Sequence, residues 1–158
     1  MTQGDLSNYG QEQWKYAEML IDTENYEKAL EILNTLLLQS NALPKLHAQR
    51  GYVLYKLETY DTAINDFSAA IEAKPQASNT LFLRGRCYEE IEQFENAITD
   101  YQRVLEICPN TADALAHKGF CFEMLGNTKA AIEAYQAALL QDSAESLALA
   151  GLKSLQKQ

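Results

Sequence analysis

Hydrophobic and polar positions recur along this chain with a period of 34 residues. The clearest marker is a set of alanines that open similar apolar, helix-compatible stretches, Ala29, Ala63, Ala97 and Ala131. Four positions after each alanine, and so on the same face of a helix, stands a large apolar or aromatic residue, Leu33, Phe67, Tyr101 or Tyr135. The pattern therefore predicts an all-α protein in which one helical unit occurs four times.

Each repeat contains two predicted helices. The first helix carries a small residue where a bulky side chain would hold the facing helix away, namely Ala17, Gly51, Gly85 or Gly119. In the two middle repeats, Pro75 and Pro109 follow the second helix, where proline ends helices. Aligned on the alanines without insertion, the repeats cover residues 10–43, 44–77, 78–111 and 112–145, after an N-terminal segment of residues 1–9.

A helix pair of this size cannot bury its own hydrophobic face, so the copies are expected to stack into one continuous solenoid domain. Residues 146–158 follow the last repeat and place Leu149, Leu152 and Leu155 at helical spacing. We expect this segment to be a capping helix, because the last pair would otherwise expose its apolar side. The alternative is that these leucines dock a partner or a second copy of the chain.

The combined pattern of small residue, aromatic, alanine and proline resembles the tetratricopeptide repeat family. The aromatics just before the predicted second helices are Tyr26, Tyr60 and Phe94. The outer repeats depart from the pattern. The first repeat has Ala17 in place of the glycine and Asn41 in place of the proline, and the fourth has Thr128 in place of the aromatic and Ser143 in place of the proline. The resemblance covers residues 10–145 and implies a right-handed superhelical solenoid of antiparallel helix pairs.

In this family partners bind on the concave face, which is lined mainly by the first helix of each pair. Outward-pointing positions of those helices give a candidate peptide-binding groove, comprising Trp14, Glu18, Tyr52, Tyr55, Phe82, Arg86, Glu89, Phe120 and Glu123. The rings at Tyr52, Phe82 and Phe120 are not needed to close the helix pairs, so we expect them to contact an extended or helical peptide. The alternative is that they pack sideways against neighbouring repeats.

Trp14 fits the groove and the core equally well, because the family usually places its large first-helix residue one position earlier, at Gln13.

One binding mode of the family is predicted to be absent. A subset of members holds the C-terminal carboxylate of heat-shock chaperones with lysines, an arginine and asparagines. Here the matching positions hold Trp14, Glu18, Gln49, Asn79 and Leu83, or one repeat later Ala48, Tyr52, Leu83, Asp113 and His117. Neither set supplies the cationic pair that a carboxylate needs.

A second charge pattern predicts a structural role. One repeat position holds Arg50, Arg84 and Lys118, and another, on the second helix, holds Asp66 and Asp100. Each arginine could pair with the aspartate of its own repeat, or each aspartate could reach forward to the cation of the next. We expect the forward link, because it would fix the stacking angle. The alternative is that these groups are merely solvated.

A formal charge of −9, from 22 acidic and 13 basic residues, opposes binding to nucleic acid or to anionic lipid. No secretion leader and no apolar run of membrane-spanning length is evident. Cys87, Cys108 and Cys121 lack paired short spacing, which favours a reducing compartment over disulfides or metal binding. We therefore expect a cytoplasmic protein without a metal or cofactor.

Catalysis has little support, because His47 and His117 stand apart without a recurring acidic partner or nucleophile, and no phosphate loop or dinucleotide fingerprint occurs. The sequence predicts a noncatalytic scaffold that binds a peptide segment or helix of a partner protein. The alternatives are a small cytoplasmic chaperone for secreted proteins, which such arrays resemble, and a self-associating module that forms homo-oligomers. An enzyme would require coupled titratable groups converging on a closed pocket.

Overall fold

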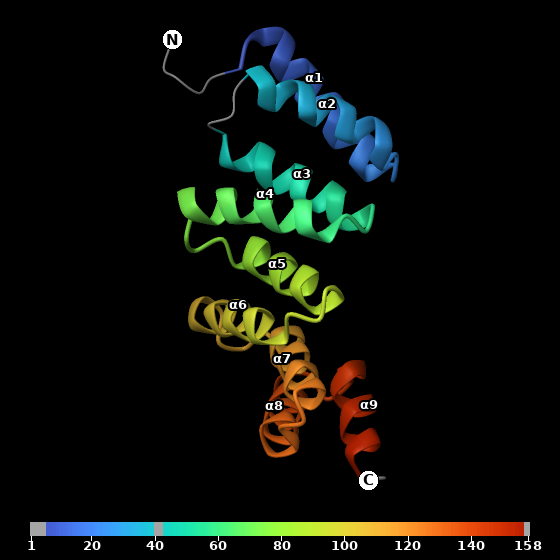
Figure 1. The fold of residues 1–158 in the computed structure, drawn as a ribbon, viewed down its shortest axis with the longest axis vertical. Helices are drawn as coiled ribbons and strands as arrows, with labels where there is room; N and C mark the ends of the chain where they lie inside the picture. Colours follow the sequence, from blue (N-terminus) through green and yellow to red (C-terminus); the bar gives the residue numbers. More distant parts are fainter. Residues whose placement is uncertain (1–5, 40–42, 157–158) are drawn as a thin grey trace. The chain divides into compact units, whose positions relative to one another are not determined.

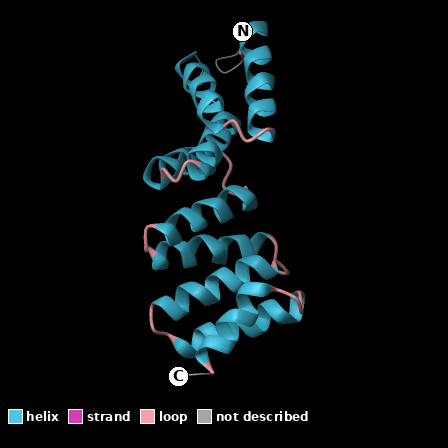
Figure 2. Ribbon diagram, turned by 90° about the vertical axis from the view of Figure 1, so that its right-hand side faces the viewer, coloured by secondary structure: helices cyan, strands magenta, loops and turns pink. Residues whose placement is uncertain are grey.

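The computed structural model describes residues 6–39 and 43–156, so the expectations for residues 1–5, 157–158 and Asn41 lie outside it. Within the described ranges the regular structure consists of nine α-helices and no strand, joined by short loops (Figures 1 and 2). The helices are α1 Asn8–Asp22, α2 Tyr26–Gln39, α3 Pro44–Lys56, α4 Tyr60–Ala73, α5 Ser78–Glu90, α6 Phe94–Ile107, α7 Ala112–Met124, α8 Thr128–Gln141 and α9 Ser146–Leu155.

The helices follow the period of the sequence. The first helices of successive pairs, and α9 after them, begin at residues 34 apart, at Pro44, Ser78, Ala112 and Ser146. The aromatics expected just before the second helices are instead their first residues. Only α1 departs from the period, since it begins at Asn8, where the Ser7 hydroxyl accepts a 3.1 Å hydrogen bond from the Gly10 amide and caps the helix.

A left-handed residue closes the turn inside each helix pair. Glu24, Glu58 and Glu92 have φ of 58°, 57° and 58°, and Gly126 has 74°. In the first pair the residue after the left-handed glutamate, Asn25, donates its amide to the Leu20 carbonyl at 2.8 Å, which satisfies a carbonyl that the helix end leaves open. This short turn brings each second helix back against the first.

The predicted close packing of the helix pairs is confirmed at the glycines of the first helices. A Cβ added at any of them would lie too close to a buried ring on the second helix; the nearest ring atoms are 2.8 Å away for Gly51 and Phe67, 2.8 Å for Gly85 and Tyr101, and 2.7 Å for Gly119 and Tyr135. The first pair has Ala17 and Leu33 at these positions, both fully buried. Glycine therefore faces an aromatic ring in three pairs, and in the first pair the larger alanine faces the smaller leucine.

The chain divides into two compact units between Leu83 and Arg84, inside α5. The N-terminal unit contains α1 to α4 and the beginning of α5, and its core includes Leu33, Leu36 and Leu46. The C-terminal unit contains the rest of α5 and the helices that follow. Its last helix pair is centred on Tyr135, which is fully buried. Each unit is described by itself below.

The tail forms helix α9, which packs against α7 and α8. Leu152 and Leu155 lie against the cluster around Tyr135, as expected, but Leu149 is 49% exposed. The expectation that all three leucines share the covered face is therefore wrong for Leu149. The helix approaches through Gly151 instead, where an added Cβ would lie 2.3 Å from the Tyr135 ring. Because no side chain intervenes there, α9 covers the ring directly.

Candidate functional site

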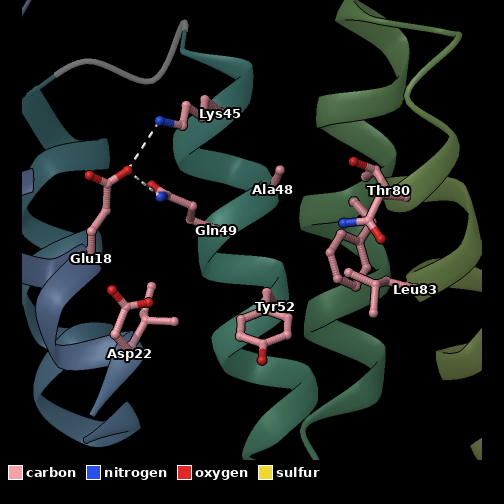
Figure 3. A pocket seen from close by; sticks show the side chains of 11 residues that line it. Glu18, Asp22, Lys45, Ala48, Gln49, Tyr52, Thr80 and Leu83 are labelled. Carbon is pink, nitrogen blue, oxygen red and sulfur yellow. Dashed lines mark hydrogen bonds and ion pairs between the residues drawn. The ribbon is translucent and has the colours of Figure 1, made fainter. Parts of the chain in front are cut away.

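The N-terminal unit contains a pocket of about 470 Å³ between α1, α3 and the beginning of α5 (Figure 3). These are the first helices of three successive pairs. Helix α1 supplies Glu18, Ile21 and Asp22, and α4 supplies Phe67 from beneath the first helices. The remaining lining comes from α3 and α5. The pocket thus lies on the face of the first helices on which the sequence places the candidate groove.

Glu18 organises the polar end of the pocket. Its Oε1 atom accepts hydrogen bonds from Lys45 Nζ at 3.1 Å and from Gln49 Nε2 at 2.9 Å, both drawn in Figure 3. The bond from Gln49 and that from Lys45 lower the pKa of Glu18 below its ordinary value of 4.5, because both stabilise the charged carboxylate. Glu18 is therefore an anion at neutral pH.

Trp14 holds the two donors of α3 in place. Its indole Nε1 donates to Gln49 Oε1, so that the Gln49 amide is bonded at both its oxygen and its nitrogen. Lys45 Nζ lies 4.8 Å from the centre of the Trp14 ring, a cation–π arrangement. Both donors that α3 contributes are thus directed toward α1.

Asp22 lies one helical turn after Glu18 on the same face of α1 (Figure 3). The residue is exposed, and its carboxylate has no hydrogen bond or ion pair within the described part of the chain. Across the pocket, α5 contributes only uncharged side chains, Asn79, Thr80 and Leu83. The pocket therefore has one acidic wall and one neutral wall.

The apolar part of the pocket is centred on Tyr52 of α3. The Tyr52 ring meets the Tyr26 ring edge to face, with centroids 6.5 Å apart, and Lys56 Nζ lies 5.7 Å from its centre. Ala48, one turn before Tyr52, is small enough to leave the pocket open. These contacts fix the orientation of the ring.

A second pocket, of about 330 Å³, adjoins the first and shares Glu18 and Lys45 with it. Trp14 lines this smaller pocket together with Leu6 and Leu43. Trp14 is also half-buried against the core of the N-terminal unit. The Trp14 side chain thus lines a pocket and also packs against the core.

The predicted groove residues are distributed unevenly between these pockets and the rest of the molecule. Glu18 and Tyr52 line the larger pocket, and Trp14 lines the smaller one. Tyr55 packs against Tyr60, with ring centroids 6.1 Å apart, and lines neither pocket. Phe82 is half-buried and also lies outside both linings.

In the C-terminal unit, Glu89 is a buried acceptor, only 8% exposed. Its carboxylate forms an ion pair with Arg86, with Nε at 3.3 Å, lies 3.1 Å from His117 Nδ1 and accepts a 3.4 Å hydrogen bond from the Cys121 thiol. His47 has an acidic partner as well, since its Nδ1 lies 2.9 Å from Asp66. Both partners lie far away in the sequence, and the two pairs occupy different repeat positions, so neither is the recurring local arrangement for which the sequence was searched. The residues equivalent to His117 in earlier repeats are not histidine, so the repeat pattern gave no signal for this contact.

Two further predicted groove residues also have partners within the C-terminal unit. The Phe120 ring meets Phe94 edge to face at 6.3 Å, and Glu123 accepts a 2.8 Å hydrogen bond from the Tyr135 hydroxyl. Arg86 forms a second, longer ion pair with Glu90 at 3.7 Å. These contacts occupy the side chains with intramolecular packing.

The repeated charges pair within their own repeat. Asp66 accepts two hydrogen bonds from Arg50, at 2.6 and 2.8 Å, and Asp100 accepts two from Arg84, both at 2.7 Å. The forward link expected from the sequence is therefore wrong. The partners lie on the two helices of one pair, where a planar guanidinium meets both oxygens of a carboxylate. Lys118, whose own repeat has no aspartate at the matching position, donates instead to Gln102 of the preceding repeat at 2.6 Å.

Asp22, Ile21 and Thr80 are pocket residues that sequence reasoning missed. The repeat offered a signal for Asp22, because it occupies the same repeat position as Lys56, and both are charged residues at the end of a first helix.

Among the described residues, no cluster of histidine, cysteine, aspartate and glutamate could hold a metal ion. Over the same ranges, every helix is too short or too polar to cross a bilayer.

Helix pairs repeating every 34 residues define a helical-repeat protein. Two family models, both described as tetratricopeptide repeat, match residues 49–112 and 113–143. The chain belongs to the tetratricopeptide repeat family, and its fold is the all-α helical-repeat fold of that family. A search of curated proteins gives no match.

Solved structures share this fold at low sequence identity. YrrB, described as "a TPR protein with an unusual peptide-binding site", has a TM-score of 0.87 and 23% identity, over 91% of this chain and 74% of that chain. MamA has a TM-score of 0.82 and 18% identity, over 87% and 81%. Residues 41 to the end of MamA from Desulfovibrio magneticus RS-1 have a TM-score of 0.81 and 20% identity, over 87% of this chain and 77% of that chain. At these identities the likeness concerns the fold.

Proposed function

We propose that this chain is a noncatalytic protein-interaction module that binds a peptide segment or helix of a partner protein in the pocket between α1, α3 and α5. The observation that carries the proposal is the pocket itself, which combines a fixed aromatic ring, Tyr52, with polar groups held in place by Glu18. Rigid rings beside oriented polar groups are typical of surfaces that bind peptides. The peptide-binding site of YrrB supports the same class of ligand.

The arrangement of titratable groups favours a noncatalytic role. His47 and His117 are bonded to the buried carboxylates of Asp66 and Glu89, which are themselves bonded to arginines. Burial raises the pKa of the Cys87 thiol to about 12 and raises that of Cys121 as well, so both are protonated and poor nucleophiles at neutral pH. Neither histidine lines either of the two pockets.

Selection of random dodecapeptides displayed on phage against the immobilised full chain would test the proposal. Selected peptides would then be synthesised with a fluorescent label and titrated by anisotropy with wild-type protein and with Tyr52→Ala. We expect Tyr52→Ala to weaken binding by about tenfold or more, as for an aromatic residue at the centre of an interface. Tyr9→Ala is the matched control, because Tyr9 is 65% exposed and lies outside both pockets.

Failure to enrich any peptide over the bare support would refute the proposal, and so would equal binding by wild type and a correctly folded Tyr52→Ala. Phe82→Ala and Phe120→Ala extend the test to the predicted remainder of the groove. A loss of affinity in either variant, with an unchanged circular dichroism spectrum, would extend the binding surface beyond the pocket. Unchanged affinity in both would confine binding to the pocket.

A further inference from the structure

We propose that the pocket between α1, α3 and α5 selects a partner peptide that carries a lysine or arginine side chain. The cation would pair with Asp22, and the aliphatic stem would lie along Tyr52 and Leu83. This inference rests on the proposed function, since it requires that a peptide occupy the pocket. It adds the charge of the ligand and the residue that reads it.

The cationic and amide donors that α3 contributes to the pocket lining are already engaged. Lys45 and Gln49 both donate to Glu18 Oε1, and Lys45 also lies over the Trp14 ring. A carboxylate or phosphate in the pocket would have to break these bonds and would then face the anionic Glu18. Replacing such charge-assisted hydrogen bonds brings little gain, so the pocket disfavours anionic ligands.

The acidic groups are in excess over the cation that faces them. Glu18 and Asp22 line the pocket with Lys45, and the bonds to Glu18 use only its Oε1 atom. Asp22 has no partner among the described residues. An arriving ammonium or guanidinium group would therefore meet a carboxylate that needs no rearrangement, one turn from a second carboxylate on the same helix face.

The shape of the pocket suits a long side chain with a charged end. Tyr52 and Leu83 offer apolar surface on the two sides, and Ala48 leaves room between them. Lysine and arginine bury their methylene stems on such surfaces while their charged ends reach polar groups. Lys56, whose Nζ lies 5.7 Å from the centre of the Tyr52 ring, is the cation of the protein with which the ligand would compete.

The test repeats the peptide selection with wild type, Asp22→Asn and Asp22→Lys. The matched control is Asp61→Asn, which removes an exposed carboxylate of α4 outside the pocket. Wild type and the control should enrich peptides with lysine or arginine next to an apolar residue. Asp22→Asn should lose the basic preference, and Asp22→Lys should enrich aspartate or glutamate. Removing the cation of Lys56, in Lys56→Gln, should strengthen the basic preference.

For one peptide selected by wild type, anisotropy should show about 1.5- to fivefold weaker binding to Asp22→Asn, the range for an exposed ion pair. Replacing the basic residue of that peptide by norleucine should cause a similar loss with wild type and no further loss with Asp22→Asn. Circular dichroism of each variant would confirm that it folds.

The outcomes separate the two proposals. Peptides that bind through Tyr52 but show no basic preference would overturn the charge inference and leave the proposed function standing. The same conclusion would follow from a basic preference that Asp22→Asn and Asp22→Lys leave unchanged. Enrichment of no peptide by any variant would instead overturn the proposed function, and this inference with it.

Discussion

The contact between Gly51 and Phe67 predicts a specific coupling between two substitutions. In each helix pair a small residue of the first helix packs against a large residue of the second. In the first pair these residues are Ala17 and Leu33, both fully buried. If the first pair and the second pair are two solutions to one packing constraint, then Gly51→Ala and Phe67→Leu should compensate each other. Together they recreate in the second pair the combination that the first pair already uses.

The magnitude follows from the geometry. A Cβ at Gly51 would lie 2.8 Å from both Cδ1 and Cε1 of Phe67, and overpacking of this kind costs about 1–3 kcal/mol. Alanine offsets about 1 kcal/mol of this through its higher helix propensity. Phe67→Leu alone removes ring atoms from a fully buried site, at a cost of about 1–2 kcal/mol. The propensity contribution cancels in a double-mutant cycle, so the coupling should equal the relieved clash, about 1–3 kcal/mol.

Urea unfolding of wild type, both single variants and the double variant measures this coupling. Trp14 is the only tryptophan of the chain and lies in the N-terminal unit, so its fluorescence reports on the unit that contains both substitutions. The reverse cycle, Ala17→Gly with Leu33→Phe, is the matched control and should show coupling of the same sign. Additive effects in both cycles, within about 0.5 kcal/mol, would refute the packing argument.

Two further predictions concern buried groups of the C-terminal unit. Asp100 is 1% exposed and accepts two hydrogen bonds from Arg84, so Asp100→Ala should destabilise the protein by about 3–5 kcal/mol in urea unfolding, while the exposed Gln102→Ala should change little. An unfolding midpoint for Asp100→Ala equal to that of wild type would contradict the buried ion pair. Of the three cysteines, Cys87 and Cys121 are buried and Cys108 is exposed, so a thiol reagent at mildly alkaline pH should modify one thiol in the folded chain and all three after denaturation. Folded Cys108→Ser should react slowly or not at all, and rapid modification of that variant would show that the buried thiols are accessible.

The fold could be predicted because the same packing constraint recurs at fixed positions. Gly85 must accommodate Tyr101 in the same way that Gly51 accommodates Phe67, and a constraint repeated at one interval is visible in the sequence alone. The failure at Leu149 has the opposite cause. Helix α9 begins in the period of the first helices, but its covered face is set by the close approach of Gly151 to Tyr135, and no earlier repeat has a glycine at that position. Leucine spacing by itself could not distinguish this face from its neighbour.

The charge partners were less predictable, because a long side chain can reach more than one carboxylate. The sequence places Asp66 within reach of a cation before it and of another after it, and only the facing of the two helices in one pair selects Arg50. The buried bond between His117 and Glu89 was missed for a different reason. Glu89 recurs one repeat later as Glu123, but His117 does not recur, so the period carries no information about the histidine that bonds to Glu89.

The same distinction explains why the candidate site had to be read from the structure. Glu18, Tyr52, Arg86 and Phe120 occupy one repeat position, yet the first two line the pocket while the last two pack against Glu89 and Phe94. Core positions must recur because every helix pair meets the same neighbour, whereas pocket positions are free to differ. Asp22 and Lys56 share such a position, so the chain itself makes the change from aspartate to lysine one repeat later. Asp22→Lys should therefore leave the packing intact and reverse only the charge that the pocket presents to a ligand.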